Sequence, residues 1–216
     1  MEFLYTIGCS TLSQNDFIRN LKVHNINVIA DVRSIPYSKI TPQFNKEELI
    51  KLLRNNRIIY IDFSKEFGAR RIETSVYENG KVSFEKTKKL QVFSDGIKRL
   101  EKGLSMGYSI ALMCTEKNPL SCHRFSLVSR GIYEKTGIEC KHILTSSDVI
   151  KSSELENEML RKFNLEADLF LSYEERVKEA YKLLNEEIGY RQTLKTLNEN
   201  LEGEFSNEKN IYMLGQ

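Results

Sequence analysis

The chain has 216 residues, enough to bury one good hydrophobic core, so we expect one domain or one domain with an appendage. Its 32 Lys and Arg against 30 Asp and Glu give a net charge of +2, which excludes the global basic signature of a polyanion-binding protein. The four cysteines are too few and too scattered for a disulfide scaffold, which predicts free thiols in a reducing, cytoplasmic compartment. The sequence shows neither a basic leader nor a long apolar stretch, so we expect no secretory signal, no membrane span and no membrane partner.

Apolar runs and capping residues alternate over residues 1–147, a pattern typical of an α/β domain. Strands are predicted at residues 3–7, 28–32, 57–63, 108–113 and 139–144. Helices are predicted at residues 13–25, 45–55, 84–104 and 121–137. The run at 57–63 does not alternate, which predicts a strand buried on both faces. Together these elements predict a mostly parallel sheet of about five strands flanked by helices.

Residues 148–216 have a different character and are predicted to form a helical C-terminal extension. Two helices rich in Glu and Lys are expected at 153–163 and 172–188, whereas 194–216 carries little pattern. The second helix has an apolar face formed by Val177, Ala180, Tyr181 and Leu184. This face is expected to pack on the body of the domain or to form a homodimer with a second subunit.

The stretch 111–130 concentrates the reactive side chains of the chain. Cys114 ends an apolar strand, and we interpret Ser121 as the N-cap of the following helix. This cap places three residues in the first helical turn, Cys122, His123 and Arg124. The unpaired N–H groups and the helix dipole there favour a thiolate or a bound anion, so the Cys122 thiol is expected to be acidified.

Polar side chains follow three of the predicted strands, and the ligand crevice of an open α/β sheet lies outside the carboxyl ends of its strands. If these strands are neighbours, we expect one shared site. Its candidate catalytic residues are Asp31, Cys114, Glu116, Cys122 and His123. Its candidate substrate-binding residues are Cys9, Ser10, Arg33, Ser34, Ser38 and Arg124. The alternative for Asp31 and Arg33 is that they only pair with each other or cap loops, and His142 is a lesser candidate that lines the crevice from the side.

The same segments carry a family resemblance. The motifs are Thr6-Ile7-Gly8-Cys9-Ser10, Asp31-Val32-Arg33-Ser34 with Pro36 and Ser38, Pro42-Gln43-Phe44-Asn45, Phe67-Gly68-Ala69-Arg70-Arg71, Leu112-Met113-Cys114-Thr115-Glu116-Lys117 and Cys122-His123-Arg124. In this combination and order, residues 3–145 resemble domain-of-unknown-function (DUF) family 488. The resemblance implies a compact bacterial or archaeal cytoplasmic α/β domain and no particular reaction. The chain departs from the family at Cys9, where His is usual, and at Ala69, where a second Gly is usual; cysteine can bind a metal but is no general base near neutral pH.

Three functions fit these residues. The first is an enzyme, a hydrolase or transferase, acting on an anionic substrate related to a nucleotide or nucleic acid. In it Cys114 or Cys122 is the nucleophile, the arginines hold the anion, and His123, Asp31 or Glu116 moves protons. The second is a metal- or haem-binding protein with the ligands Cys9, Cys114, Cys122 and His123.

Residue types in the second hypothesis suit zinc or iron. The spacing lacks short Cys-x-x-Cys hooks, and adjacent residues on a helix point in different directions. The third function is a non-catalytic nucleic-acid-binding module with the basic residues Lys39, Arg54, Arg57, Arg70 and Arg71. The expected partner is therefore a small anionic ligand or a nucleic acid, and the cofactor stays open.

Overall fold

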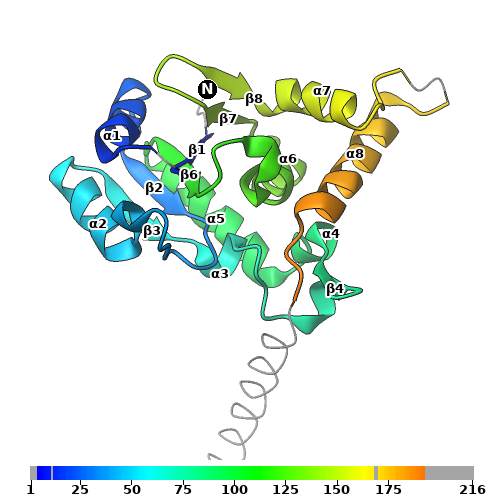
Figure 1. Cartoon of the computed structure of the whole chain (residues 1–216), viewed down its shortest axis with the longest axis horizontal. Coiled ribbons are helices and arrows are strands. Elements are labelled where there is room, and N and C mark those ends of the chain that lie inside the picture. The colour runs from blue at the N-terminus through cyan, green and yellow to red at the C-terminus, as the bar shows by residue number, and fades with distance from the viewer. Residues whose placement is uncertain (1–3, 11, 168–169, 193–216) are drawn as a thin grey trace, which may run out of the picture.

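The computed structural model describes residues 4–10, 12–167 and 170–192 and contains a six-stranded sheet of order β3-β2-β6-β1-β7-β8 (Figure 1). Its strands are β1 (Leu4–Gly8), β2 (Val28–Asp31), β3 (Ile59–Asp62), β6 (Ile110–Cys114), β7 (Cys140–Ile143) and β8 (Val149–Lys151). The first five are parallel to one another, and β8 runs antiparallel to β7. The predicted α/β fold with a mostly parallel sheet is confirmed. Strand β8 was not predicted, because three residues leave too little pattern to recognise.

Helices cover both faces of the sheet (Figure 1). They are α1 (Gln14–Val23), α2 (Lys46–Asn55), α3 (Ser64–Phe67), α4 (Phe84–Thr87), α5 (Gln91–Ser105), α6 (Arg130–Thr136), α7 (Ser152–Lys162) and α8 (Tyr173–Ile188). Ser13 caps α1 by accepting a hydrogen bond from the Asp16 N–H, and Gly137 ends α6 with φ of 73°. The predicted turn at Asn79-Gly80 joins the short strands β4 (Tyr77–Glu78) and β5 (Lys81–Val82).

The core has two layers because successive side chains of a strand face opposite sides of the sheet. In β2, Val28 and Ala30 pack with the apolar stripe of α5, whereas Ile29 packs with α1 and α2. In β6, Ala111 and Met113 pack on that same second face. Both central strands are therefore buried on both sides, and only their carboxyl ends can present side chains to a ligand.

Two predicted elements differ from the structure. Strand β3 is an edge strand that pairs only with β2, so its residues are partly exposed and the prediction of burial on both faces was wrong. The helix predicted at 84–104 is split into α4 and α5, because Leu90 has extended backbone (ψ 143°). The Lys88 side chain at this break is buried and forms ion pairs with Glu85 and Glu134. Tertiary contacts of this kind are not visible in the local apolar pattern.

The C-terminal helices form a third apolar cluster with the loop and helix that follow β6. The cluster contains Leu120, Phe125, Leu155, Met159, Leu160, Val177, Ala180, Tyr181 and Leu184. The apolar face of α8 is thus covered by this chain itself, while self-association and the boundary at 147/148 stay predictions. Residues 194–216, expected to lack pattern, lie outside the described residues. Within the described ranges, the helices are all too short or too polar to cross a membrane.

Candidate functional site

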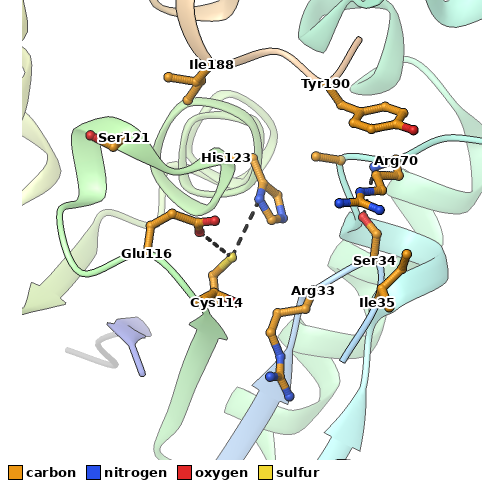
Figure 2. A pocket seen from close by; sticks show the side chains of 12 residues that line it. Arg33, Ser34, Ile35, Arg70, Cys114, Glu116, Ser121, His123, Ile188 and Tyr190 are labelled. Atoms are coloured by element: carbon orange, nitrogen blue, oxygen red, sulfur yellow. Dashed lines mark hydrogen bonds between the residues drawn. The ribbon is translucent and has the colours of Figure 1, made fainter. Parts of the chain in front are cut away.

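The sheet order places β6 between β2 and β1, so the carboxyl ends of the three strands that carry the predicted site are neighbours. A cavity of about 220 Å³ opens at this edge (Figure 2). It is lined by Arg33, Ser34, Ile35, Ala69, Arg70, Cys114, Thr115, Glu116, Ser121, His123, Ile188 and Tyr190. A cavity is therefore present at the predicted edge, and it draws residues from the segments after β2 and β6 and from residues 69–70 and 188–190, but not from the segment after β1.

The segment after β6 does not start its helix where the sequence indicated. Asn118, not Ser121, caps a short 3-10 turn (Pro119–Ser121), with its Oδ1 accepting from the Leu120 N–H at 2.9 Å. Cys122 is extended (φ −138°, ψ 136°), and a π-helix (Arg124–Ser129) begins only after His123. The prediction of Ser121 as N-cap was wrong because the local turn takes up these residues. The adjacent side chains of positions 122 and 123 are consequently not held apart by a regular helix.

Four side chains converge at one point, and we call Cys114, Glu116, Cys122 and His123 the loop cluster. Their ligand-type atoms all lie within 4.8 Å of one another. The Sγ atoms of Cys114 and Cys122 are 3.0 and 2.9 Å from the same Glu116 Oε2, and Cys114 Sγ is 3.7 Å from His123 Nδ1. Figure 2 shows the Cys114, Glu116 and His123 side chains pointing toward one another at one wall of the cavity.

His123 is oriented by a backbone contact behind it. Its Nε2 lies 3.0 Å from the Val32 carbonyl oxygen, which can only accept, so Nε2 carries a proton. In the neutral ring this leaves the lone pair of Nδ1 directed at the sulfur of Cys114. Burial lowers the pKa of His123, but the contacts with Cys122 and the Val32 carbonyl outweigh it and raise the pKa above its usual value.

The two thiols of the loop cluster differ in acidity and in access. The hydrogen bond with Cys122 and burial raise the pKa of Cys114, whose side chain lines the cavity. Burial also acts on Cys122, yet the hydrogen bond from Cys114 and the positive charge of Arg124 lower its pKa well below the usual range. Cys122 is 1% exposed and is not among the cavity-lining residues. The predicted acidification of Cys122 agrees with this direction, but the acidic sulfur does not face the cavity.

Arg124 is fully buried and holds the loop from behind. Its guanidinium donates to the carbonyl oxygens of Glu116 and Lys117 at 2.5 and 2.9 Å and to Thr6 Oγ1 at 3.3 Å. Among the described residues it has no ion pair with a carboxylate. The predicted substrate-binding role of Arg124 is therefore not matched by its position, because its donors are directed at the backbone and not at the cavity.

Gly8 allows the loop to cross the end of β1. A Cβ at this position would overlap the Glu116 carbonyl oxygen, which is also the acceptor of the Arg124 guanidinium. The loop is further held by the N–H of Cys9 on the Cys114 carbonyl (2.9 Å) and the N–H of Ser10 on the Thr115 carbonyl (2.6 Å). Close backbone packing thus fixes the base of the loop, and glycine is the residue that permits it.

Asp31 and Arg33 form a buried bidentate pair, the alternative that the sequence left open. Arg33 Nε and Nη2 donate to the two carboxylate oxygens of Asp31 at 2.9 and 2.7 Å, and Arg33 Nη1 donates to the Phe44 carbonyl. Tyr60 Oη also donates to Asp31. Figure 2 shows the Arg33 guanidinium pointing away from the Cys114 sulfur. With their polar atoms engaged, neither residue is placed to move protons or to hold an anion in the cavity.

The remaining predicted residues divide between the cavity and the loops around it. Ser34 lines the cavity, and its Oγ accepts a hydrogen bond from the Arg70 N–H at 2.8 Å. Cys9 is completely buried, and Ser38 Oγ accepts from backbone N–H groups of its own loop. Neither these two nor Ser10 lines the cavity, and Cys9 is not part of the loop cluster.

Seven of the twelve cavity-lining residues were not among the predicted catalytic or substrate-binding residues, and Arg70, Ile188 and Tyr190 are three of these. The Arg70 guanidinium lies 5.0 Å from the centre of the Tyr190 ring, and within the described chain it makes no hydrogen bond or ion pair. Its neighbour Arg71 is instead buried and forms an ion pair with Glu73. Arg71 therefore does not belong to an exposed basic surface with Arg70, as the nucleic-acid-binding hypothesis expected. The Phe67-Gly68-Ala69-Arg70-Arg71 motif was the signal that could have located Arg70.

His142 was a lesser candidate for a residue that lines the cavity from the side, and it does not line the cavity. Its ring is fully buried on β7, with Nδ1 2.7 Å from Thr6 Oγ1 and Nε2 2.9 Å from Ser152 Oγ. Burial and the positive charge of Arg124 lower the pKa of His142 to about 3, so the ring is neutral. It is therefore a satisfied core residue.

The fold and the site define an α/β protein with a thiol, carboxylate and imidazole cluster at the carboxyl edge of a mostly parallel sheet. The chain belongs to the protein family described as Domain of unknown function DUF488, whose sequence model matches residues 13–130, more than half of the chain. The match confirms the family resemblance and includes the loop cluster, whereas the β1 motif lies outside the matched residues. No curated protein and no solved structure matches the chain.

Proposed function

We propose that the loop cluster binds one divalent transition metal ion of the zinc class. The observation that carries the proposal is the convergence of two Sγ atoms, one imidazole Nδ1 and one carboxylate oxygen within 4.8 Å of one another. A tetrahedral ion with bonds of about 2.0 to 2.3 Å separates its ligand atoms by about 3.3 to 3.8 Å. Three of the separations between these atoms are 2.9, 3.0 and 3.7 Å, and all lie within 4.8 Å, so side-chain rotations would bring the four atoms to these values.

The surroundings of the cluster have the features of an outer shell around a metal. His123 donates its Nε2 proton to the Val32 carbonyl, the arrangement that fixes the tautomer and direction of metal-binding histidines. Two thiolates, one carboxylate and a neutral imidazole around a divalent ion carry a net charge of −1. Arg124 is buried behind the loop without a carboxylate partner among the described residues, and its positive charge complements that centre.

The geometry also removes two objections that the sequence raised. Cys122 and His123 are adjacent, but the extended backbone of Cys122 lets both side chains reach one point. The long separation of Cys114 from Cys122 is closed by a loop that Arg124 holds at two carbonyls. A haem is a poorer fit, because the cavity of about 220 Å³ lies below the roughly 300 to 1,000 Å³ of typical cofactor sites.

A second candidate is an enzyme, a hydrolase or transferase, that acts on a small anionic substrate at this metal. The observation that favours it is that Cys114, Glu116 and His123 line a cavity, whereas a purely structural metal site is closed. In this proposal the cysteines are ligands, because Cys122, the more acidic thiol, does not face the cavity. Rapid labelling of metal-free protein by iodoacetamide at Cys114 or Cys122 would instead favour a nucleophilic thiol.

Elemental analysis of untagged protein purified without chelator tests the metal proposal. We expect about one zinc-class ion per chain in the wild type and in Cys140→Ala, and loss of the ion in Cys122→Ala. Cys140 is the matched control because it is a second fully buried cysteine, outside the loop cluster. A wild type that neither retains metal nor takes up added zinc would overturn the proposal, as would Cys122→Ala with full metal content.

A further inference from the structure

The loop cluster has one side that faces the cavity and one that faces the protein. Cys114, Glu116 and His123 are cavity-lining residues, whereas Cys122 lies behind them. Of the three that face the cavity, only Glu116 is a carboxylate. Its backbone is held by Arg124, and its side chain accepts hydrogen bonds from the two thiols. When the thiols lose their protons to a metal, these two hydrogen bonds disappear. Glu116 is then the ligand with the fewest constraints.

The opposite wall of the cavity carries a positive charge that has no ion pair among the described residues. The Arg33 guanidinium is hydrogen-bonded to Asp31 and to the Phe44 carbonyl. Arg70 also lines the cavity, and within the described ranges its guanidinium contacts only the Tyr190 ring, which leaves its five donors unused. Figure 2 shows Arg70 and Tyr190 across the cavity from the loop cluster.

Arg70 is held at this wall by its backbone. Ser34 Oγ accepts from the Arg70 N–H at 2.8 Å, and a Cβ at Gly68 would lie 2.8 Å from that same Ser34 Oγ. The chain therefore needs glycine at position 68 to bring the Arg70 backbone against Ser34. This close packing places the guanidinium beside the cavity, although the side chain itself is long and exposed.

We propose that the metal has an exchangeable coordination position on the cavity side, where a small carboxylate or phosphate replaces Glu116 and is held at its outer oxygens by Arg70. The inference rests on the proposed metal centre and names the class of ligand that it takes. One oxyanion replaces another, so the metal keeps an oxygen ligand. The planar guanidinium of Arg70 can donate two hydrogen bonds to the oxygens that do not bind the metal. The cavity of about 220 Å³ admits such an ion with a short apolar body against Ile35 and Ile188, and it cannot enclose a whole nucleotide.

Cobalt substitution tests the proposal, because Co²⁺ in a thiolate site gives sulfur-to-metal charge-transfer bands and visible bands that report its coordination. The full chain is freed of metal, reloaded with Co²⁺, and titrated with inorganic phosphate and, separately, with acetate. We expect saturable changes in the visible bands with at least one of these anions. Arg70→Gln is expected to weaken the anion at least tenfold, whereas Arg54→Gln, which removes an equal exposed charge outside the cavity, leaves it unchanged.

The outcomes separate this inference from the metal proposal. Charge-transfer bands that do not respond to either anion would overturn the exchangeable position while supporting the metal centre. Saturable changes that are the same in Arg70→Gln and wild type would overturn the role of Arg70. Absence of charge-transfer bands after Co²⁺ loading would overturn the metal centre itself, and the inference with it.

Discussion

The protein has two neighbourhoods that each contain cysteine and histidine, and only the one beside the cavity has the form of a ligand site. In the loop cluster, Cys114, Cys122 and His123 direct sulfur and nitrogen atoms at one another and at a single carboxylate oxygen. On β7, Cys140 and His142 are completely buried, and the two ring nitrogens of His142 are each within hydrogen-bond distance of a hydroxyl.

The difference shows that residue type does not by itself make a site. A hydroxyl can donate or accept, so Thr6 and Ser152 satisfy a neutral His142 whichever nitrogen carries its proton. Burial raises the pKa of Cys140 to about 12, so its thiol stays protonated. In the loop cluster several electron-rich atoms share one space beside a cavity, which is the arrangement that a metal ion stabilises.

Metal removal gives the largest expected effect and acts on only one of the two neighbourhoods. Binding of an ion to the folded state alone contributes about 4 kcal/mol to the free energy of unfolding when free zinc is 1,000 times Kd. We therefore expect chelator to lower the Tm of the wild type and of Cys140→Ala strongly, and that of Cys122→Ala by little. Thermal unfolding with and without zinc checks this. Equal chelator responses in Cys122→Ala and wild type would contradict it.

Gly8→Ala is expected to damage the loop cluster through the backbone of Glu116. The new Cβ overlaps the Glu116 carbonyl oxygen, so the loop must shift, at a cost of about 1 to 3 kcal/mol in stability. A displaced loop also weakens zinc by about 10- to 100-fold, as loss of outer-shell support does at other metal sites.

Gly80→Ala is the matched control for Gly8→Ala. A Cβ at Gly80 meets nothing within 4 Å, but its φ of 76° makes alanine strained there by about 1 kcal/mol. Competition with a zinc chelator measures both variants. If Gly8→Ala binds zinc as tightly as Gly80→Ala, the supporting role of the close packing at Gly8 is wrong.

The pH dependence of stability should carry the signature of His142. Its pKa of about 3 in the folded protein lies below the unfolded value of about 6.5, so the unfolded chain takes up a proton that the folded one rejects. The contribution of neutral His142 is complete above pH 6.5 and declines as the pH falls toward 3. Between pH 7 and pH 5 it amounts to about 2 kcal/mol.

Urea unfolding of wild type and His142→Gln at both pH values isolates this contribution, because all other titrating groups are shared. The wild type is expected to lose about 2 kcal/mol more than the variant on going from pH 7 to pH 5. Identical losses would show that His142 is not a buried neutral residue.

Ser152→Ala is the smallest change and tests whether the β7 neighbourhood is purely structural. The variant removes the hydroxyl 2.9 Å from His142 Nε2, which costs about 1 kcal/mol of stability. Zinc content and affinity should remain those of the wild type. A Ser152→Ala protein with reduced zinc content would mean that the two neighbourhoods are not independent.

Much of the fold could be predicted because local signals agreed with the tertiary structure. The Ser13 cap, the Gly137 helix end and the turn at Asn79-Gly80 each depend on residues a few positions apart. The prediction that Cys114 shares a site with the segment after β2 followed from parallel strands having a common carboxyl edge, whereas Cys9 and Ser10 after β1 do not line the cavity. Topology of this kind is visible in the alternation of strands and helices.

The rest depended on contacts between distant segments. The position of Ser121 was misread because a turn capped by Asn118 takes up the residues before the helix. The Arg124 guanidinium could bind an anion. Its hydrogen bonds to the loop carbonyls, which the sequence does not reveal, already occupy its donors. Arg70 becomes a cavity residue through Ser34, which is 36 positions away in sequence. Sequence patterns indicate which groups can react, and packing decides which of them are left available.

X-ray absorption at the zinc edge, on full-length protein loaded with one equivalent of zinc, tests the central claim most directly. A centre formed by the loop cluster predicts two sulfur neighbours at about 2.3 Å and two nitrogen or oxygen neighbours at about 2.0 to 2.2 Å. Cys122→Ala should lose one sulfur neighbour or the ion altogether, and Cys140→Ala should give the wild-type spectrum. A zinc environment of nitrogen and oxygen alone would contradict the claim that Cys114, Glu116, Cys122 and His123 form a metal centre.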